Sequence, residues 1–433
     1  VQLSVMHVDR ELFMEQGFLI LRNVVPRDQL VQLRWHFETA LEAQKLLWAK
    51  EAGPDDPPGG LWEKSGMPTL GLDLVVESQT APAVEFCLAE NTLGVCAQLM
   101  QAEPAPRVIQ MMCSPIVDYG HTEWHRDIDS IAVAPLEGLA MDTQANGPGE
   151  LQWNIALYDD DVFWVVPGSH LRPETEEETR QLLKDPRVPL PGARQVELKA
   201  GDAVVYTNIL LHWGSIYTAK LRRTVHFAYR AFGGQLFPHY HLPHFNFDFD
   251  FIEKLAPAPR AAFERFQDLY TQERKDIERL LRAILARDEA AFRVALEVLH
   301  PGKKGKMVAL VLLSKWAQYI AMLSRADVRN LPMEERASAA GVDSIAVWFY
   351  AEVAHRFTES EGQELELRFA GLEAQMAADR EAAYARIREQ FRGFEPIPGD
   401  PSSFDFRTRA TRTLYSNMPT DHGLDEFIAG WDG

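Results

Sequence analysis

The spacing of hydrophobic residues divides the chain into a strand-rich part and a helical part. From about residue 106 to 232, short apolar runs are separated by turns containing Gly, Pro and Asp, a pattern typical of β-strands. The clearest strands are expected at 17–25, 151–157, 163–166, 203–206, 210–212 and 222–229. Helices are expected at 26–50, at about 80–101 and, with an acidic surface, near 174–184.

Beyond about residue 250 the apolar residues recur at helical spacing, and strand signals almost disappear. Helices are predicted at 261–299, 306–325, 341–358 and 363–391, followed by an irregular tail from residue 395. The sequence therefore predicts an α+β protein with a strand-containing domain at 1–250 and a helical C-terminal extension at 251–433.

The segment Trp124-His125-Arg126-Asp127 is the strongest candidate for chemistry. On an extended strand, His125 and Asp127 project from one face and Arg126 from the other. His212, at the end of a later apolar run, can add a second imidazole. Two histidines and one carboxylate form a facial triad that leaves open positions on Fe(II). This pattern predicts a redox metal site.

Other readings of the histidines remain open. His125 could be a buried histidine bonded to a nearby carboxylate, and the pair His121-x-Glu123 just upstream offers a rival pair of ligands. The run 238–244, Pro-His-Tyr-His-Leu-Pro-His, could form a second metal site, a substrate contact or a surface loop. His170, in the segment Pro-Gly-Ser-His, is expected to shape a turn.

An ordered series of motifs across roughly residues 8–235 resembles the phytanoyl-CoA dioxygenase family of Fe(II)/2-oxoglutarate oxygenases. The series is GFLILRNVV, WHRD, FWVVPGSH, AGDAVV with LLHWGS, and RRTVHF. The resemblance implies a double-stranded β-helix (jelly-roll, cupin-like) core with flanking helices. It also implies that His125, Asp127 and His212 hold Fe(II), and that an arginine of the pair Arg222/Arg223 binds the co-substrate 2-oxoglutarate.

The chain differs from the family pattern around that arginine pair. Trp213 separates His212 from the Gly-Ser that usually follows the distal histidine, and the loop to the arginines is short. Only one arginine of the pair can face the interior of the barrel. We expect it to be Arg222, because Thr224 then takes the place of the small residue usually found two positions later.

Polar residues elsewhere on the expected strands are further candidates for binding 2-oxoglutarate. Gln110 and Ser215 could each donate a hydrogen bond to the co-substrate. Asn154 stands where relatives often place a tryptophan near the co-substrate. The resemblance therefore implies a co-substrate pocket whose detailed packing differs from that of the family.

Composition narrows the possible partners and location. The 433 residues carry a net charge of −19, which disfavours binding to nucleic acid or to an anionic membrane surface. Three sparse cysteines indicate a reducing compartment, so we expect a cytoplasmic protein. The apolar segment 307–323 is too short and too polar to span a membrane.

The resemblance implies that the chain hydroxylates a C–H bond of a small-molecule substrate, using O₂ and converting 2-oxoglutarate to succinate. The same iron chemistry could instead end in desaturation, cyclisation or epimerisation. A non-catalytic binding or assembly module is a further alternative. The helical extension could cover the barrel or form a homodimer, since amphipathic faces of this size need burial.

Overall fold

Two antiparallel sheets form the N-terminal half of this computed structural model, which describes residues 6–117, 122–127, 140, 143–215, 220–232, 250–299, 306–342, 344–390, 392 and 424–432. The larger sheet has the strand order β1-β7-β4-β9-β3-β2, and the smaller sheet has the order β6-β5-β8. Their bounds are β1 Phe18–Leu21, β2 Thr69–Gly71, β3 Glu103–Cys113, β4 Glu150–Ala156, β5 Phe163–Val165, β6 Arg194–Gln195, β7 Ala203–Thr207, β8 His212–Gly214 and β9 Arg223–Phe232.

Strand β9 decides which side chains of the larger sheet face the smaller one. It pairs with β3 on one side and β4 on the other, so that His226 lies opposite both Gln110 and Asn154. Because side chains alternate along a strand, these three polar residues point into the space between the sheets. Phe227 and Tyr229, in the alternate positions, join the hydrophobic core on the opposite face.

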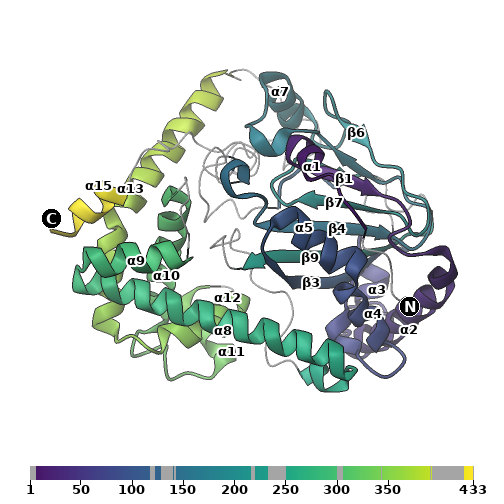
Figure 1. Cartoon of the computed structure of the whole chain (residues 1–433), viewed down its shortest axis with the longest axis horizontal. Helices are drawn as coiled ribbons and strands as arrows, with labels where there is room; N and C mark the ends of the chain where they lie inside the picture. Colours follow the sequence, from purple (N-terminus) through teal and green to yellow (C-terminus); the bar gives the residue numbers. More distant parts are fainter. Residues whose placement is uncertain are drawn as a thin grey trace.

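Helices cover that opposite face of the larger sheet (Figure 1). Tyr229 Oη donates a 2.6 Å hydrogen bond to the carbonyl of Cys87, and Phe227 packs against Phe86 with ring centroids 6.0 Å apart. Packing on the helices therefore leaves the polar face of the sheet for the space inside the barrel. The helices of this half are α1 Arg10–Gln16, α2 Arg27–Lys50, α3 Leu61–Lys64, α4 Ala81–Glu85, α5 Val95–Met100 and α7 Glu176–Lys184.

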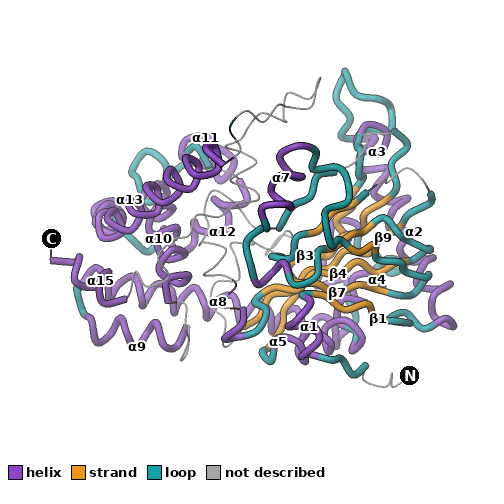
Figure 2. The backbone as a smooth tube through the Cα atoms, turned by 90° about the horizontal axis from the view of Figure 1, so that it is seen from above, coloured by secondary structure: helices purple, strands orange, loops and turns teal. Residues whose placement is uncertain are grey.

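The C-terminal helices lie beside the barrel, and α8 extends from them toward the sheets (Figures 1 and 2). The side chain of Glu273 on α8 pairs with Arg230 at the end of β9, and Tyr270 packs edge-on against Phe232. The helices are α8 Pro257–Ala286, α9 Glu289–Leu299, α10 Lys306–Leu323, α11 Met333–Ala340, α12 Ser344–Ala354, α13 Glu359–Gln390 and α15 Leu424–Ala429.

The α+β class, the double-stranded β-helix core and the helical C-terminal region are confirmed. Three local predictions were wrong. The helix expected at 80–101 is interrupted, because Ala89 adopts an extended conformation between short helical turns. His125 belongs to no full strand and forms only an isolated bridge with His212. The tail is not irregular throughout, since α15 packs Phe427 against Phe292.

Candidate metal centre and co-substrate pocket

His125, Asp127 and His212 come together between the two sheets. One ligand atom from each lies within 4.8 Å of the others. The Nε2 atoms of His125 and His212 lie 3.4 and 3.3 Å from the two carboxylate oxygens of Asp127. Ligand atoms about 2.1 Å from one metal and at right angles would lie about 3 Å apart. Two imidazoles and one carboxylate on one side of a metal fit the donor set of non-haem Fe(II).

Backbone contacts orient both imidazoles toward the same point. His125 Nδ1 lies 2.7 Å from the carbonyl of Glu123, and His212 Nδ1 lies 2.9 Å from the carbonyl of Leu210. A carbonyl can only accept, so each Nδ1 carries the proton and each Nε2 is left as the ligand atom. The bridge between His125 and His212 adds two backbone hydrogen bonds of 3.0 Å, which hold the two ligand segments side by side.

The electrostatics of the cluster favour an ionised carboxylate. Burial raises the pKa of Asp127, but the charges and hydrogen bonds of His212 and His125 outweigh it and hold that pKa well below its usual range. The backbone N–H of Asp127 donates a hydrogen bond to the carbonyl of Asn208 at 2.9 Å, which fixes the position of this residue. An ionised carboxylate beside two imidazole nitrogens is suited to bind a divalent cation.

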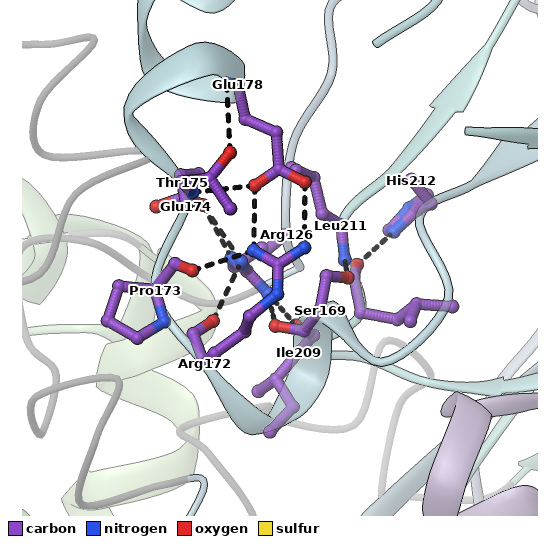
Figure 3. Close-up of polar contacts among 11 residues, drawn as sticks. Arg126, Ser169, Arg172, Pro173, Glu174, Thr175, Glu178, Ile209, Leu211 and His212 are labelled. Carbon is purple, nitrogen blue, oxygen red and sulfur yellow. Dashed lines mark hydrogen bonds and ion pairs between the residues drawn. The ribbon is translucent and has the colours of Figure 1, made fainter. Parts of the chain in front are cut away.

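The side chain of Arg126 lies apart from His212 and reaches Glu174, in the loop that precedes α7 (Figure 3). Its guanidinium donates to the carbonyls of Ser169, at 2.8 Å, and Ile209, and pairs with Glu174 at 2.9 Å. Both charged side chains are completely buried. Ser169 Oγ in turn accepts from the N–H of Leu211, next to the ligand His212. One buried cation therefore connects the His125–Asp127 segment to the segment that carries His212.

A cavity of about 440 Å³ opens beside the triad, within the range of about 300–1,000 Å³ common for small-molecule sites. Phe163 and Tyr206 line its apolar wall next to His212. Polar side chains from the larger sheet line the rest, namely Arg107, Gln110, Gln152, Asn154, Arg222 and His226. The cavity can therefore hold polar ligands beside a metal at the triad.

The two arginines of the candidate pair point in opposite directions. Arg222 lines the cavity, and its Nε donates to Asp160 Oδ2 at 2.7 Å. Thr224 Oγ1 donates to the same oxygen at 2.9 Å. Arg223 faces the helices instead, where Nε pairs with Glu38 at 3.2 Å. The alternation expected along the strand is therefore present, with Arg222 inward and Arg223 outward.

The other candidate residues differ in where they lie. Gln110 lines the cavity, opposite His226. Ser215 Oγ donates to the carbonyl of Val162 at 2.9 Å, so its hydroxyl serves the contact between strands. Asn154 Oδ1 lies 3.0 Å from His226 Nδ1. Burial lowers the pKa of His226 to about 4, so this imidazole is neutral near pH 7.

The remaining histidine predictions have different outcomes. Nε2 of His170 contacts the carbonyl of Met14 at 3.0 Å, away from the cavity, which agrees with a role in the turn. His121 and the run 238–244 lie outside the described residues. Within the described ranges, the His125–Asp127–His212 group is the one cluster of three residues that can hold a metal ion.

Sequence reasoning missed three residues of this site. Asp160 engages both Arg222 and Thr224 from a loop between β4 and β5, and no local motif marks it. Arg107 and Gln152 line the cavity from β3 and β4. Arg107 could have been found from the sequence, because it interrupts the apolar run after residue 103 and an arginine on a buried strand needs a partner or a ligand.

Comparison with known proteins identifies the family. The sequence model of the phytanoyl-CoA dioxygenase (PhyH) family matches residues 13–224, which contain every strand of the barrel except most of β9 and all three residues of the triad. A search of curated proteins gave no match. None of the described helices is long and apolar enough to span a membrane.

Solved structures with a similar fold are distant in sequence. They include the α-ketoglutarate-dependent carbocyclase SnoK from nogalamycin biosynthesis (19% identity, TM-score 0.37, covering 57% of this chain and 90% of SnoK). They also include the epimerase SnoN from the same biosynthesis (16% identity, TM-score 0.35, covering 52% of this chain and 80% of SnoN). A third is EctD from S. alaskensis with 2-oxoglutarate and 5-hydroxyectoine (16% identity, TM-score 0.38, covering 53% of this chain and 78% of EctD). On the strength of the family match and the triad within it, the chain belongs to the phytanoyl-CoA dioxygenase family of Fe(II)/2-oxoglutarate-dependent oxygenases.

Proposed function

We propose that this protein hydroxylates a C–H bond of a small-molecule substrate, with Fe(II) held by His125, Asp127 and His212. The observation that carries the proposal is the triad itself, with three ligand atoms within 4.8 Å at the wall of a polar cavity. Fe(II) with 2-oxoglutarate and O₂ supplies the oxidation: one oxygen atom enters the substrate as hydroxyl, the other enters succinate, and CO₂ leaves.

The residues of the chain bind and orient the reactants. Arg222 is proposed to bind the distal carboxylate of 2-oxoglutarate, because a guanidinium binds carboxylates in a planar, two-point geometry. Asp160 holds Arg222 through Nε at 2.7 Å, and Thr224 joins the same carboxylate. Gln110, which lines the cavity, is proposed as a further contact of the co-substrate.

Substrate pose decides how the reaction ends, so the same site could also catalyse desaturation, cyclisation or epimerisation. Among the distant structures, SnoK is described as a carbocyclase and SnoN as an epimerase. Halogenation is disfavoured, because Asp127 would supply a carboxylate ligand and would leave no protein position at the metal for a halide. The helical extension is proposed to cover one end of the barrel, with a homodimer as the alternative.

The test is anaerobic addition of Fe(II) and 2-oxoglutarate, followed by absorption spectroscopy. A visible charge-transfer band is expected for the wild type and for Arg223→Ala. His212→Ala should lose it, because one metal ligand is missing. Arg222→Ala should need tens to thousands of times more 2-oxoglutarate, since losing a buried charged partner costs about 2–5 kcal/mol. No band and no bound iron in the wild type would refute the proposed function.

A further inference from the structure

His226 lies on the cavity face of β9, one strand repeat away from the end proposed for the distal carboxylate of 2-oxoglutarate. Arg222 and Thr224 share Asp160 at that end. His226 follows Thr224 by two residues, so it projects from the same face about 6.6 Å further along the strand. Its side chain lines the cavity. The imidazole is therefore placed to contact a second molecule, next to the co-substrate.

One nitrogen of this imidazole is committed to the neighbouring strand. His226 lies opposite Asn154 of β4, and its Nδ1 is 3.0 Å from Asn154 Oδ1. An amide oxygen can only accept, so Nδ1 carries the proton. A backbone hydrogen bond with Trp153, next to Asn154 on the same strand, also favours a proton on this ring. Because burial keeps the imidazole neutral near pH 7, Nε2 carries a lone pair and can only accept a hydrogen bond.

The charges near His226 select the kind of donor that Nε2 can bind. The positive charge of Arg107, which lines the same cavity, acts against a further positive charge at His226. The negative charge of Asp127 acts in the opposite direction, but the divalent metal ion of the proposed function would offset it. An ammonium group would therefore be repelled. A carboxylate has no proton to donate to the lone pair of Nε2. An uncharged hydroxyl or amide N–H fits this nitrogen.

The wall of the cavity next to the triad is aromatic. Phe163 and Tyr206 lie with their ring centroids 5.5 and 5.1 Å from that of His212. Ligand pockets commonly combine an apolar wall with a few polar groups that fix the orientation of the ligand. A molecule that packs its carbon skeleton on these rings and points its donor at His226 would hold a C–H bond close to the metal ligands.

We propose that Nε2 of His226 accepts a hydrogen bond from an uncharged donor of the substrate, and that the substrate is consequently a small molecule with a hydroxyl or amide N–H group. Asn154 is the positioning residue, because it fixes the proton on Nδ1 and leaves Nε2 as the acceptor. This inference rests on the proposed function, and it deepens that function by naming the class of substrate. His226 selects the substrate, while the triad and Arg222 bind the metal and the co-substrate.

The position of the proton is tested first, by nitrogen NMR of protein that carries isotope-labelled histidine and is loaded with diamagnetic Zn(II) and 2-oxoglutarate. The signals of His226 are those that are missing from His226→Gln. We expect a protonated Nδ1 and an unprotonated Nε2 near neutral pH. A proton on Nε2 would overturn the inference, since that nitrogen could then no longer accept.

Calorimetric titration of the anaerobic Fe(II)·2-oxoglutarate protein tests the substrate class. The probes are small cyclic alcohols, each matched with its fluoro analogue, and small lactams, each matched with its lactone. Each analogue keeps the size of its partner but has no proton to donate. At least one alcohol or lactam should bind at least about tenfold more tightly than its analogue, because the analogue leaves Nε2 buried without a partner. The pair that shows this preference identifies the donor as hydroxyl or amide.

Variants locate that preference at His226. His226→Leu removes the acceptor, so the donor and its analogue should bind equally. His226→Gln should keep a several-fold preference, because its amide oxygen can accept. His170→Leu is the matched control and should keep the full preference, since His170 is also buried but contacts the carbonyl of Met14, away from the cavity. All three should form the charge-transfer band at the same 2-oxoglutarate concentration as the wild type, whereas Arg222→Ala needs more.

The outcomes separate this inference from the proposed function. If the band forms normally but no donor binds better than its analogue, or if His226→Leu keeps the preference, the inference is wrong and the proposed function stands. If both variants of His226 need far more 2-oxoglutarate, His226 binds the co-substrate instead. If the band never forms, the proposed function and this inference fail together. The proton position and the preference of the wild type require no variant, so they decide the inference even if His226→Leu fails to fold.

Discussion

Replacing Arg126 by methionine should destabilise the fold and weaken metal binding at the same time. Methionine keeps much of the length of the side chain but leaves Glu174 buried without its cation, and the carbonyls of Ser169 and Ile209 lose their donor. Both members of the ion pair are completely buried, so solvent does not screen the loss. Breaking such a pair costs about 3–5 kcal/mol.

The double variant Arg126→Met/Glu174→Gln should recover a large part of this loss, since no buried charge remains. Arg172→Met is the matched control. Arg172 also pairs with a glutamate, Glu178, but the Arg172 side chain is 37% exposed and Glu178 keeps its hydrogen bond from the N–H of Thr175, so the loss of Arg172 should cost less than the loss of Arg126.

Urea unfolding followed by tryptophan fluorescence gives the stabilities, and anaerobic Fe(II) titration gives the metal affinity. We expect Arg126→Met to weaken Fe(II) binding and Arg172→Met to leave it unchanged, because only Arg126 joins the segments that carry the ligands. Equal losses for Arg126→Met and Arg172→Met would refute the reasoning. So would a variant that loses stability but binds Fe(II) with undiminished affinity.

Three other predictions concern pH, truncation and the thiols. Burial lowers the pKa of His226 to about 4, so the stability that comes from the neutral imidazole is complete above about pH 6.5 and is lost as the pH falls toward 4. The free energy of unfolding of His226→Gln should therefore depend less on pH in that window. The truncated chain 1–250 should aggregate in size-exclusion chromatography, because removing α8 exposes Phe232 and leaves Arg230 without Glu273; a soluble monomer that still forms succinate would contradict this. A thiol reagent should react only after unfolding, since all three cysteines are buried and burial raises the pKa of each, in Cys87, Cys96 and Cys113.

Periodicity and motif order predicted the sheets, most helices and the grouping of the triad, because these depend on local alternation and on one ordered set of motifs. The inward position of Arg222 followed from alternation along the strand together with the resemblance, which places a small residue, here Thr224, two positions after the inward arginine. The bridge at His125 was not predicted, because an isolated pair of backbone hydrogen bonds leaves no periodic trace.

The ion pairs of the cavity were beyond sequence reasoning for a different reason. Asp160 is 62 residues from Arg222, and Glu273 is 43 residues from Arg230. Nothing in a local pattern selects such partners among the many acidic residues of the chain. The α15 helix was missed because its six residues are too few to establish a helical period, and it is held by packing of Phe427 on Phe292 and Phe369.

Strand β9 has a consequence for engineering the specificity of this protein. Shifting the pairing register of β9 by one residue would turn Arg223, Val225 and Phe227 inward and would remove Thr224 and His226 from the cavity. A shift of two residues would keep Thr224 and His226 on the inward face but would displace each of them by about 6.6 Å. Insertions within the strand are therefore not interchangeable. A library that lengthens β9 should add residues in even numbers, and each added pair would move the polar groups along the cavity by one strand repeat.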